Sequence, residues 1–340
     1  MSIAPVQMLE QLLHGECVSH FPEIIPVNPP ITAIMEKSGI FWPEAHREAG
    51  LMADLATACQ EMLGFNAVNV PFDMTVEAEA LGCEIVWKEG IAVTPQVKDR
   101  EREEDDILDF GDAVFSRGRF PVVLQALSKL RDRHGGTVPL ISFMEGPFTI
   151  AGLVFGVNRM YKNLIKDSGK SKRILQKLCE LTIAYAEHQL NAGADTIIML
   201  DPNAMGLTVQ QFDEYLLPLY KTITGSIETP LILHICGNVN PLLNSIGCSN
   251  FAAFSFDYPA VQVESVKKAL GEKMRIIGSV PTISHLLNGI RKEVFTLSLE
   301  MIDLGVHLLA PSCFTPPEAP FDNVKAMMDA IHHWNQNNYL

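Results

Sequence analysis

Short apolar runs alternate with longer stretches of helical periodicity along this chain. Eight runs rich in Val, Ile, Leu and Phe each lead into a polar residue or a turn. The runs occupy residues 21–27, 67–72, 139–145, 195–201, 231–236, 251–257, 274–280 and 306–312. Runs of this length and composition, bounded by turn residues, are typical of buried β-strands.

The stretches between these runs predict helices. In residues 42–63 the apolar residues Leu51, Leu55 and Cys59 recur at helical spacing, and Gly64 follows in the position of a C-terminal cap. Helices are also expected over residues 6–14, 75–81, 120–133, 147–166, 170–192 and 208–226.

This alternation of strands and helices favours a parallel sheet in an α/β fold. Eight such units predict a (β/α)8 barrel, the TIM barrel. A doubly wound open sheet is the alternative. However, no Gly-x-Gly-x-x-Gly motif follows the first strand to support a dinucleotide-binding fold.

The chain is expected to form one domain over residues 1–340, with a helical extension at about residues 1–20. One stretch, at about residues 84–118, breaks the regular pattern. It contains a run of mixed charges at residues 99–106. Such runs are typical of solvated surface, so we interpret the stretch as an excursion from the barrel rather than a domain boundary.

Composition and charge narrow the classes of function. Hydrophobic residues make up 47% of the 340 positions and charged residues 19%, which favours a large core over disorder. The net charge of −14 disfavours binding to nucleic acid or to an anionic membrane. No apolar run reaches the roughly 18–20 residues that span a bilayer. With no secretion signal and seven scattered cysteines, a cytoplasmic protein is expected.

Reactive side chains gather at the ends of the predicted strands. In a TIM barrel the catalytic groups lie at the carboxyl ends of the strands. The residues found there are Glu145, Asp201, His234, Cys236, Asp257 and Cys313. If the fold is as predicted, these side chains surround one mouth of the barrel.

His234 and Cys236 are two residues apart on one strand, so their side chains point to the same face. One histidine and two cysteines form an allowed ligand set for catalytic zinc, which leaves a fourth position open. Cys313 is the candidate for the third ligand, and thiolates select against magnesium and calcium. The alternative is a core histidine beside buried thiols that pack as small apolar groups.

Each of the remaining polar residues at the strand ends has two possible interpretations. Asp257 is either a displaceable fourth metal ligand or an aspartate that caps a helix or belongs to the loop. Glu145 and Asp201 either bind substrate or cap the helices that follow them. Asn238, in the polar turn after Cys236, is a further candidate for substrate binding.

Several segments resemble the methylcobalamin:coenzyme M methyltransferases of the uroporphyrinogen decarboxylase superfamily. The His-x-Cys motif with its downstream cysteine is the most specific part, and the similarity extends over nearly the whole chain. The matching segments are 233–241, 309–313 with Pro316 and Pro317, 41–46, 80–85 and 144–147.

The resemblance implies a uroporphyrinogen decarboxylase-like TIM barrel with Zn²⁺ on His234, Cys236 and Cys313. It also implies transfer of a methyl group from methylcobalamin, or from a corrinoid protein as partner, to a zinc-activated thiol such as coenzyme M. The family places a glutamate near the metal, where the nearest match here is Asp257, shorter by one methylene. Ser312 stands where the family tends to have glycine.

Three other functions stay open. In the first, the protein is a methyltransferase whose methyl acceptor is another molecule, such as tetrahydrofolate. In the second, it binds a corrinoid or a metal without catalysis. In the third, it is a uroporphyrinogen decarboxylase-like lyase. The decarboxylases carry an arginine-rich segment after the first strand. Residues 27–33 contain no arginine, which disfavours the lyase.

The barrel prediction also restricts the geometry of the metal site. His234 and Cys236 lie on the fifth predicted strand and Cys313 follows the eighth. These strands are not adjacent in a closed eight-stranded barrel. The metal would therefore bridge part of the mouth, with Cys313 on the turn after its strand.

Overall fold

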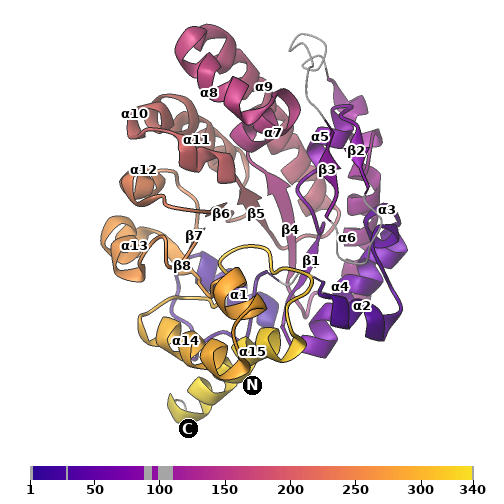
Figure 1. Cartoon of the computed structure of the whole chain (residues 1–340), viewed down its shortest axis with the longest axis vertical. Coiled ribbons are helices and arrows are strands. Elements are labelled where there is room, and N and C mark those ends of the chain that lie inside the picture. The colour runs from indigo at the N-terminus through magenta and orange to yellow at the C-terminus, as the bar shows by residue number, and fades with distance from the viewer. Residues whose placement is uncertain (1–2, 28–29, 88–93, 99–109, 339–340) are drawn as a thin grey trace.

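The computed structural model describes residues 3–27, 30–87, 94–98 and 110–338. Its main sheet has six strands in the order β1-β4-β5-β6-β7-β8, and every neighbouring pair is parallel (Figure 1). The strands are β1 (Val68–Val70), β4 (Leu140–Glu145), β5 (Thr196–Leu200), β6 (Ile232–Ile235), β7 (Ala253–Phe256) and β8 (Arg275–Ile277). The predicted α/β class with a parallel sheet is confirmed.

Helices cover the outside of the sheet (Figure 1). The α-helices of eight or more residues are α1 (Pro5–Leu13), α4 (Ala49–Leu63), α6 (Phe120–His134), α7 (Pro147–Phe155), α8 (Val157–Lys166), α9 (Ser168–Asn191), α11 (Leu217–Ser226), α13 (Val263–Leu270), α14 (Arg291–Asp303) and α15 (Phe321–Asn338). Shorter ones are α2 (Thr32–Ser38), α3 (Glu44–Arg47), α5 (Val76–Ala80), α10 (Val209–Gln211) and α12 (Leu243–Ile246). As expected, Gly64 caps α4 in a left-handed conformation.

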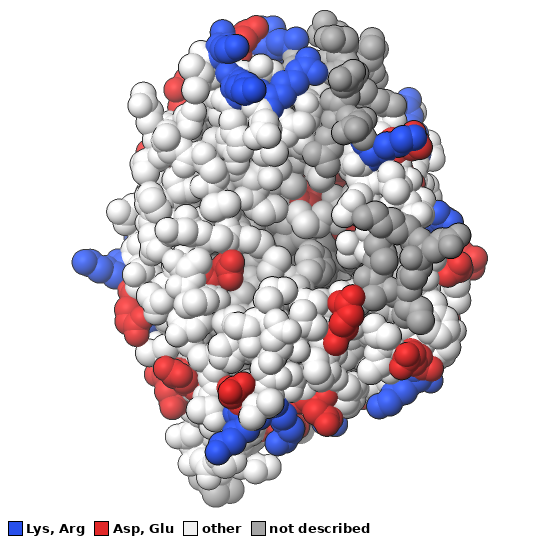
Figure 2. Space-filling view, viewed as in Figure 1, with Lys and Arg blue, Asp and Glu red and all other residues white. Residues whose placement is uncertain are grey.

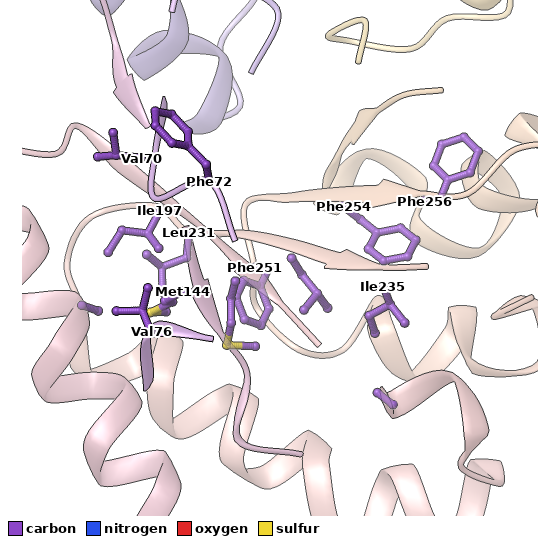
Figure 3. Close-up of a cluster of buried hydrophobic side chains, with 14 of the residues drawn as sticks. Val70, Phe72, Val76, Met144, Ile197, Leu231, Ile235, Phe251, Phe254 and Phe256 are labelled. Carbon is purple, nitrogen blue, oxygen red and sulfur yellow. The ribbon is translucent and has the colours of Figure 1, made fainter. Parts of the chain in front are cut away.

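Alternate residues of each strand belong to two different apolar layers. Ile141 and Phe143 of β4 belong to an interior layer enclosed by the sheet. Met144 of β4 and Ile197 of β5 belong to the layer between the sheet and the helices. Figure 3 shows part of this outer layer. The two-residue period of a strand therefore sends one set of side chains inward and the other toward the helices.

Two of the eight predicted strands, 21–27 and 306–312, form no continuous ladder. Residues 306–312 pair with the β8 region through the isolated bridges Ile277↔Leu308 and Val280↔Pro311, with backbone hydrogen bonds such as that from Gly278 N to Leu308 O at 3.0 Å. Residues 21–27 are extended without strand pairing. The prediction of full strands was wrong for these two segments, and in the first of them Pro22 and Pro26 have no backbone N–H to donate to a ladder.

Both segments nevertheless complete the barrel wall. Ile24 and Val27 from the first segment and Leu308 and Ala310 from the second join the interior layer. Asn69 of β1 donates a hydrogen bond of 2.8 Å to the carbonyl oxygen of Pro26, which fastens the first segment beside the sheet. Both segments thus help to surround the interior, as the TIM-barrel prediction requires.

Helix α1 covers the amino-terminal ends of the strands. Its buried residues, Met8, Leu9, Leu12 and Leu13, belong to the interior layer. Arg275, the first residue of β8, donates a hydrogen bond of 3.1 Å to the carbonyl oxygen of Leu12. This end of the barrel is therefore filled by apolar side chains.

The expected excursion contains a small hairpin that the sequence pattern did not predict. β2 (Ile85–Val86) and β3 (Gln96–Val97) pair in antiparallel orientation. The charged run at residues 99–106 lies outside the described residues. Within the described ranges, no helix has the length and apolar character to cross a bilayer.

Candidate metal centre

Strand β6 carries the histidine of the site and delivers the first cysteine. His234 shares its face with Ile232, which belongs to the interior layer, so the imidazole points into the barrel. Cys236 follows the strand directly, and its Sγ lies 2.9 Å from His234 Nε2. The prediction that both side chains point the same way is confirmed.

Cys313 completes the group from the other side of the mouth. It lies in the bend after residues 306–312, and its Sγ is 3.2 Å from that of Cys236. One ligand atom from each of His234, Cys236 and Cys313 lies within 4.8 Å of the other two. The mouth is bridged as expected, and the three atoms form a candidate metal site.

A serine on the neighbouring strand orients the histidine. Ser255 of β7 is the register partner of His234. Its Oγ lies 2.9 Å from His234 Nδ1, on the side of the ring opposite Cys236. With Nδ1 engaged in this way, Nε2 faces the two thiols. Partners of this kind fix the ring orientation of histidines that bind metals.

The donor set suits a soft or borderline metal ion rather than magnesium or calcium. The hydrogen bond from the Cys236 thiol lowers the pKa of Cys313 to about 4, and although burial opposes this shift, contact with His234 adds to it. This arrangement favours the thiolate form at Cys313. The imidazole and the sulfurs converge on one point, so the residues fit a bound ion.

Asp257 and Asn238 lie at the edge of this centre. Asp257 Oδ2 accepts a hydrogen bond of 3.2 Å from the amide of Gly237, and no Asp257 oxygen belongs to the group of three ligand atoms. Asn238 is exposed, and its Oδ1 accepts hydrogen bonds from Asn240. Metal ligation by Asp257 and substrate binding by Asn238 stay predictions.

Asp201 is buried and directed toward the helices. Its Oδ1 accepts hydrogen bonds from the amide and the hydroxyl of Thr149, at 2.8 and 2.7 Å, and its Oδ2 accepts one from Tyr220 at 2.9 Å. These contacts join β5 to α7 and α11. Asp201 therefore anchors helices other than the one that follows it, and its predicted contact with substrate stays a prediction.

Glu145 ends β4 and faces the interior on the same side as His234. The register aligns Glu145 with Leu200, and Leu200 with His234, so the two polar residues stand level, two strands apart. Glu145 Oε2 is buried and has no hydrogen-bond partner among the described residues. Burial raises the pKa of Glu145 well above 4.5, and the nearby charges of Glu77 and Asp201 raise it further.

Comparison with known proteins places this architecture in a family. The model of the uroporphyrinogen decarboxylase (URO-D) family matches residues 7–334. The chain belongs to the uroporphyrinogen decarboxylase family.

Within the uroporphyrinogen decarboxylase family, methyltransferases are among the similar proteins. A methylated-thiol–coenzyme M methyltransferase of Methanosarcina mazei is 31% identical over 318 residues, covering 93% of this chain and 86% of the relative. A methylcobamide:CoM methyltransferase of Methanosarcina barkeri is 32% identical over 94% of both chains. A solved methyltransferase from Methanosarcina mazei matches with a TM-score of 0.93 at 32% identity, over 98% of this chain and 99% of the other.

In this family member, a pocket of about 470 Å³ adjoins Cys313. It lies between the hairpin strand β3, the loop after β1 and the loop that carries Cys313. Its described lining residues are Trp42, Phe72, Asp73, Met74, Thr75, Thr94, Pro95, Gln96, Val97, Leu153, Cys313, Phe314, Thr315 and Pro317. Figure 2 shows a hollow near the centre of one face, with atoms of acidic residues inside.

Sequence reasoning missed two parts of this family member's site. No sequence motif indicated Ser255, because its contact with His234 depends on the register between two strands. Asp73 and Arg119 lie 46 residues apart and form a buried ion pair through Asp73 Oδ2 and Arg119 Nη1 at 2.5 Å. Asp73 follows β1, so its place at a strand end was the available signal.

Proposed function

We propose that this protein is a zinc-dependent methyltransferase that moves a methyl group from a methylated corrinoid to a thiol. The observation that carries the proposal is the convergence of His234, Cys236 and Cys313 at one mouth of the barrel. The similarity to methylcobamide:CoM methyltransferases over most of the chain supports it.

The activation of the acceptor thiol is the chemical problem that the site addresses. A free thiol with a pKa of about 8.5 is only a few per cent thiolate at pH 7. His234, Cys236 and Cys313 would hold a zinc ion with a fourth position left open, and such an ion would lower the pKa of an acceptor thiol bound there.

The residues of the chain set the geometry of the transfer. His234, fixed by Ser255, and the two cysteines would hold the acceptor sulfur at the mouth of the barrel. The thiolate sulfur attacks the methyl carbon of the corrinoid and forms a thioether. The carbon–cobalt bond breaks, and its electron pair stays on the cobalt as cob(I)alamin.

The donor would approach from the open mouth. A corrinoid is too large to enter a pocket of about 470 Å³, so it would lie over the mouth, carried by a corrinoid protein as partner. The aromatic and aliphatic walls beside Cys313 would exclude water from the acceptor sulfur.

Metal analysis and the corrinoid spectrum test this proposal. We expect about one zinc per chain and loss of that zinc in Cys236→Ala and Cys313→Ala. Cys248→Ala is the matched control, because Cys248 is exposed and away from the group. Methylcobalamin should lose its methyl group only when a thiol is added. Full activity of metal-free protein would refute the proposal.

A further inference from the structure

The pocket beside Cys313 has a distinct electrostatic character. Its size falls in the range of small-molecule sites, roughly 300–1,000 Å³. Its walls are mostly apolar, with Trp42, Phe72 and Phe314 among them, and no lysine or arginine belongs to the described lining. Asp73 is the one carboxylic acid in that described lining.

Asp73 is ionised, and the nearest cation is already neutralised. Burial favours the neutral acid, but the charge of Arg119 and the contact with His46 outweigh it and hold the pKa of Asp73 well below its usual range. Arg119 is buried, and it donates to Asp73, to Thr75 and to Glu79. Two carboxylates therefore face one guanidinium, and among the described lining residues no lysine or arginine is left for an anionic ligand.

A second, independent observation comes from Glu145. Its Oε2 is buried without a hydrogen-bond partner among the described residues, and the carboxyl faces the interior level with His234. An unpaired buried polar atom is costly, and a ligand that donates a hydrogen bond removes the cost. The nearby acidic groups Glu77 and Asp201 also disfavour a further negative charge beside Glu145, such as that of an anionic ligand.

From this geometry we infer that the acceptor is a thiol whose tail donates hydrogen bonds and carries no negative charge. The inference rests on the proposed thiol methylation and specifies its substrate class. A sulfonate tail would lose its hydration beside the acidic groups Asp73 and Glu145 and would gain no cation from the described lining in return. A hydroxyl or ammonium tail would instead donate to the free oxygen of Glu145.

Three thiols that differ only in the tail test the inference: 2-mercaptoethanol, 2-aminoethanethiol and 2-mercaptoethanesulfonate. With methylcobalamin as donor, we expect kcat/KM for the hydroxyl and ammonium thiols to exceed that for the sulfonate by about tenfold or more, from one unfavourable charge contact. Isothermal titration calorimetry with the three methyl thioether products should give the same order without turnover. A sulfonate that is preferred in both measurements would overturn the inference.

Variants separate the effect of the pocket from the intrinsic reactivity of the thiols. Glu145→Gln should lower the ratio of ammonium to sulfonate kcat/KM about fivefold or more, because the amide cannot ionise beside the ammonium. Asp213→Asn, an exposed carboxylate-to-amide change, should leave the ratio unchanged. An unchanged ratio in Glu145→Gln would remove Glu145 from the inference. If no thiol is methylated, the proposed function fails; if the sulfonate is the best acceptor, only the inference fails.

Discussion

The Sγ atoms of Cys236 and Cys313 lie 3.2 Å apart, although 77 residues separate the two cysteines along the chain. Cys236 follows β6 and Cys313 follows the segment beyond β8, so β7 and β8 stand between them in the wall. The contact therefore exists only because the sheet curves around its interior. The three ligands of the metal site are therefore brought together only when the barrel wall is formed.

Removal of the Ser255 hydroxyl should weaken the metal site without unfolding the protein. In Ser255→Ala, His234 Nδ1 loses the partner that fixes its ring. We expect metal affinity to fall about 10–100-fold, measured by competition with a chromophoric chelator. Ser284→Ala removes a similar serine–histidine contact, of 2.9 Å to His285, on the surface, and should leave the affinity unchanged. Equal affinities in the two variants would contradict the orienting role.

A side chain at Gly237 should destabilise the protein, because the backbone there is left-handed. Its φ is +78°, and a Cβ atom would lie 2.9 Å from the Sδ of Met205. Gly237→Ala should cost about 1–2 kcal/mol of stability and lower the metal affinity, because Cys236 is the adjacent residue. Gly225→Ala, in helix α11 with open space around it, should instead stabilise by about 0.4–1 kcal/mol. Urea unfolding and chelator competition measure both effects.

Glu77 should make the protein less stable as the pH rises. Burial raises the pKa of Glu77 from 4.5 to about 7. Between pH 4.5 and 7 the unfolded chain releases this proton while the folded protein keeps it, so stability falls by up to about 1.4 kcal/mol per pH unit.

Glu77→Gln tests this assignment. Gln keeps an oxygen to accept the amide of Glu145, which Glu77 now accepts at 2.8 Å, but has no proton to release. The variant should gain stability over wild type at pH 8 and show no such gain at pH 4.5, in urea unfolding. The matched change Glu264→Gln, at an exposed position of α13, should show no difference between the two pH values. A gain in stability for Glu77→Gln at both pH values would show that ionisation of Glu77 is not what destabilises the protein at high pH.

Tyr220→Phe should destabilise the protein and leave the metal in place. It removes the hydrogen bond to Asp201 Oδ2 and leaves that buried oxygen unpaired, at a cost of about 1–3 kcal/mol. Tyr215→Phe removes bonds to the uncharged Leu164 carbonyl and Ser168 hydroxyl, so its cost should be smaller. An altered KM for the thiol with unchanged stability would instead assign Asp201 to the substrate.

The sequence was most informative where local periodicity decides the structure. The two-residue period of a strand predicted that His234 and Cys236 share a face, and six of the eight apolar runs are strands of the main sheet. The contact of Cys313 with Cys236 also followed once a closed barrel was assumed. The first two inferences needed no information about partners far away in the chain, whereas the third depended on the barrel.

The remaining features depend on pairing that no local pattern encodes. Residues 21–27 and 306–312 are as apolar as the true strands, but the first segment forms no ladder and the second forms only isolated bridges beside β8. Ser255 became visible only through its register with His234. The ion pair between Asp73 and Arg119 joins the loop after β1 to the start of α6.

Helix α1 closes the amino-terminal end of the barrel with Leu9, Leu12 and their neighbours. Both reactants of the proposed transfer must therefore use the same entrance. A corrinoid lying over that entrance would block the route to Cys313, so the thiol has to bind first and its thioether has to leave last. The kinetics of methyl transfer would then follow a compulsory order, in which excess corrinoid traps the empty enzyme.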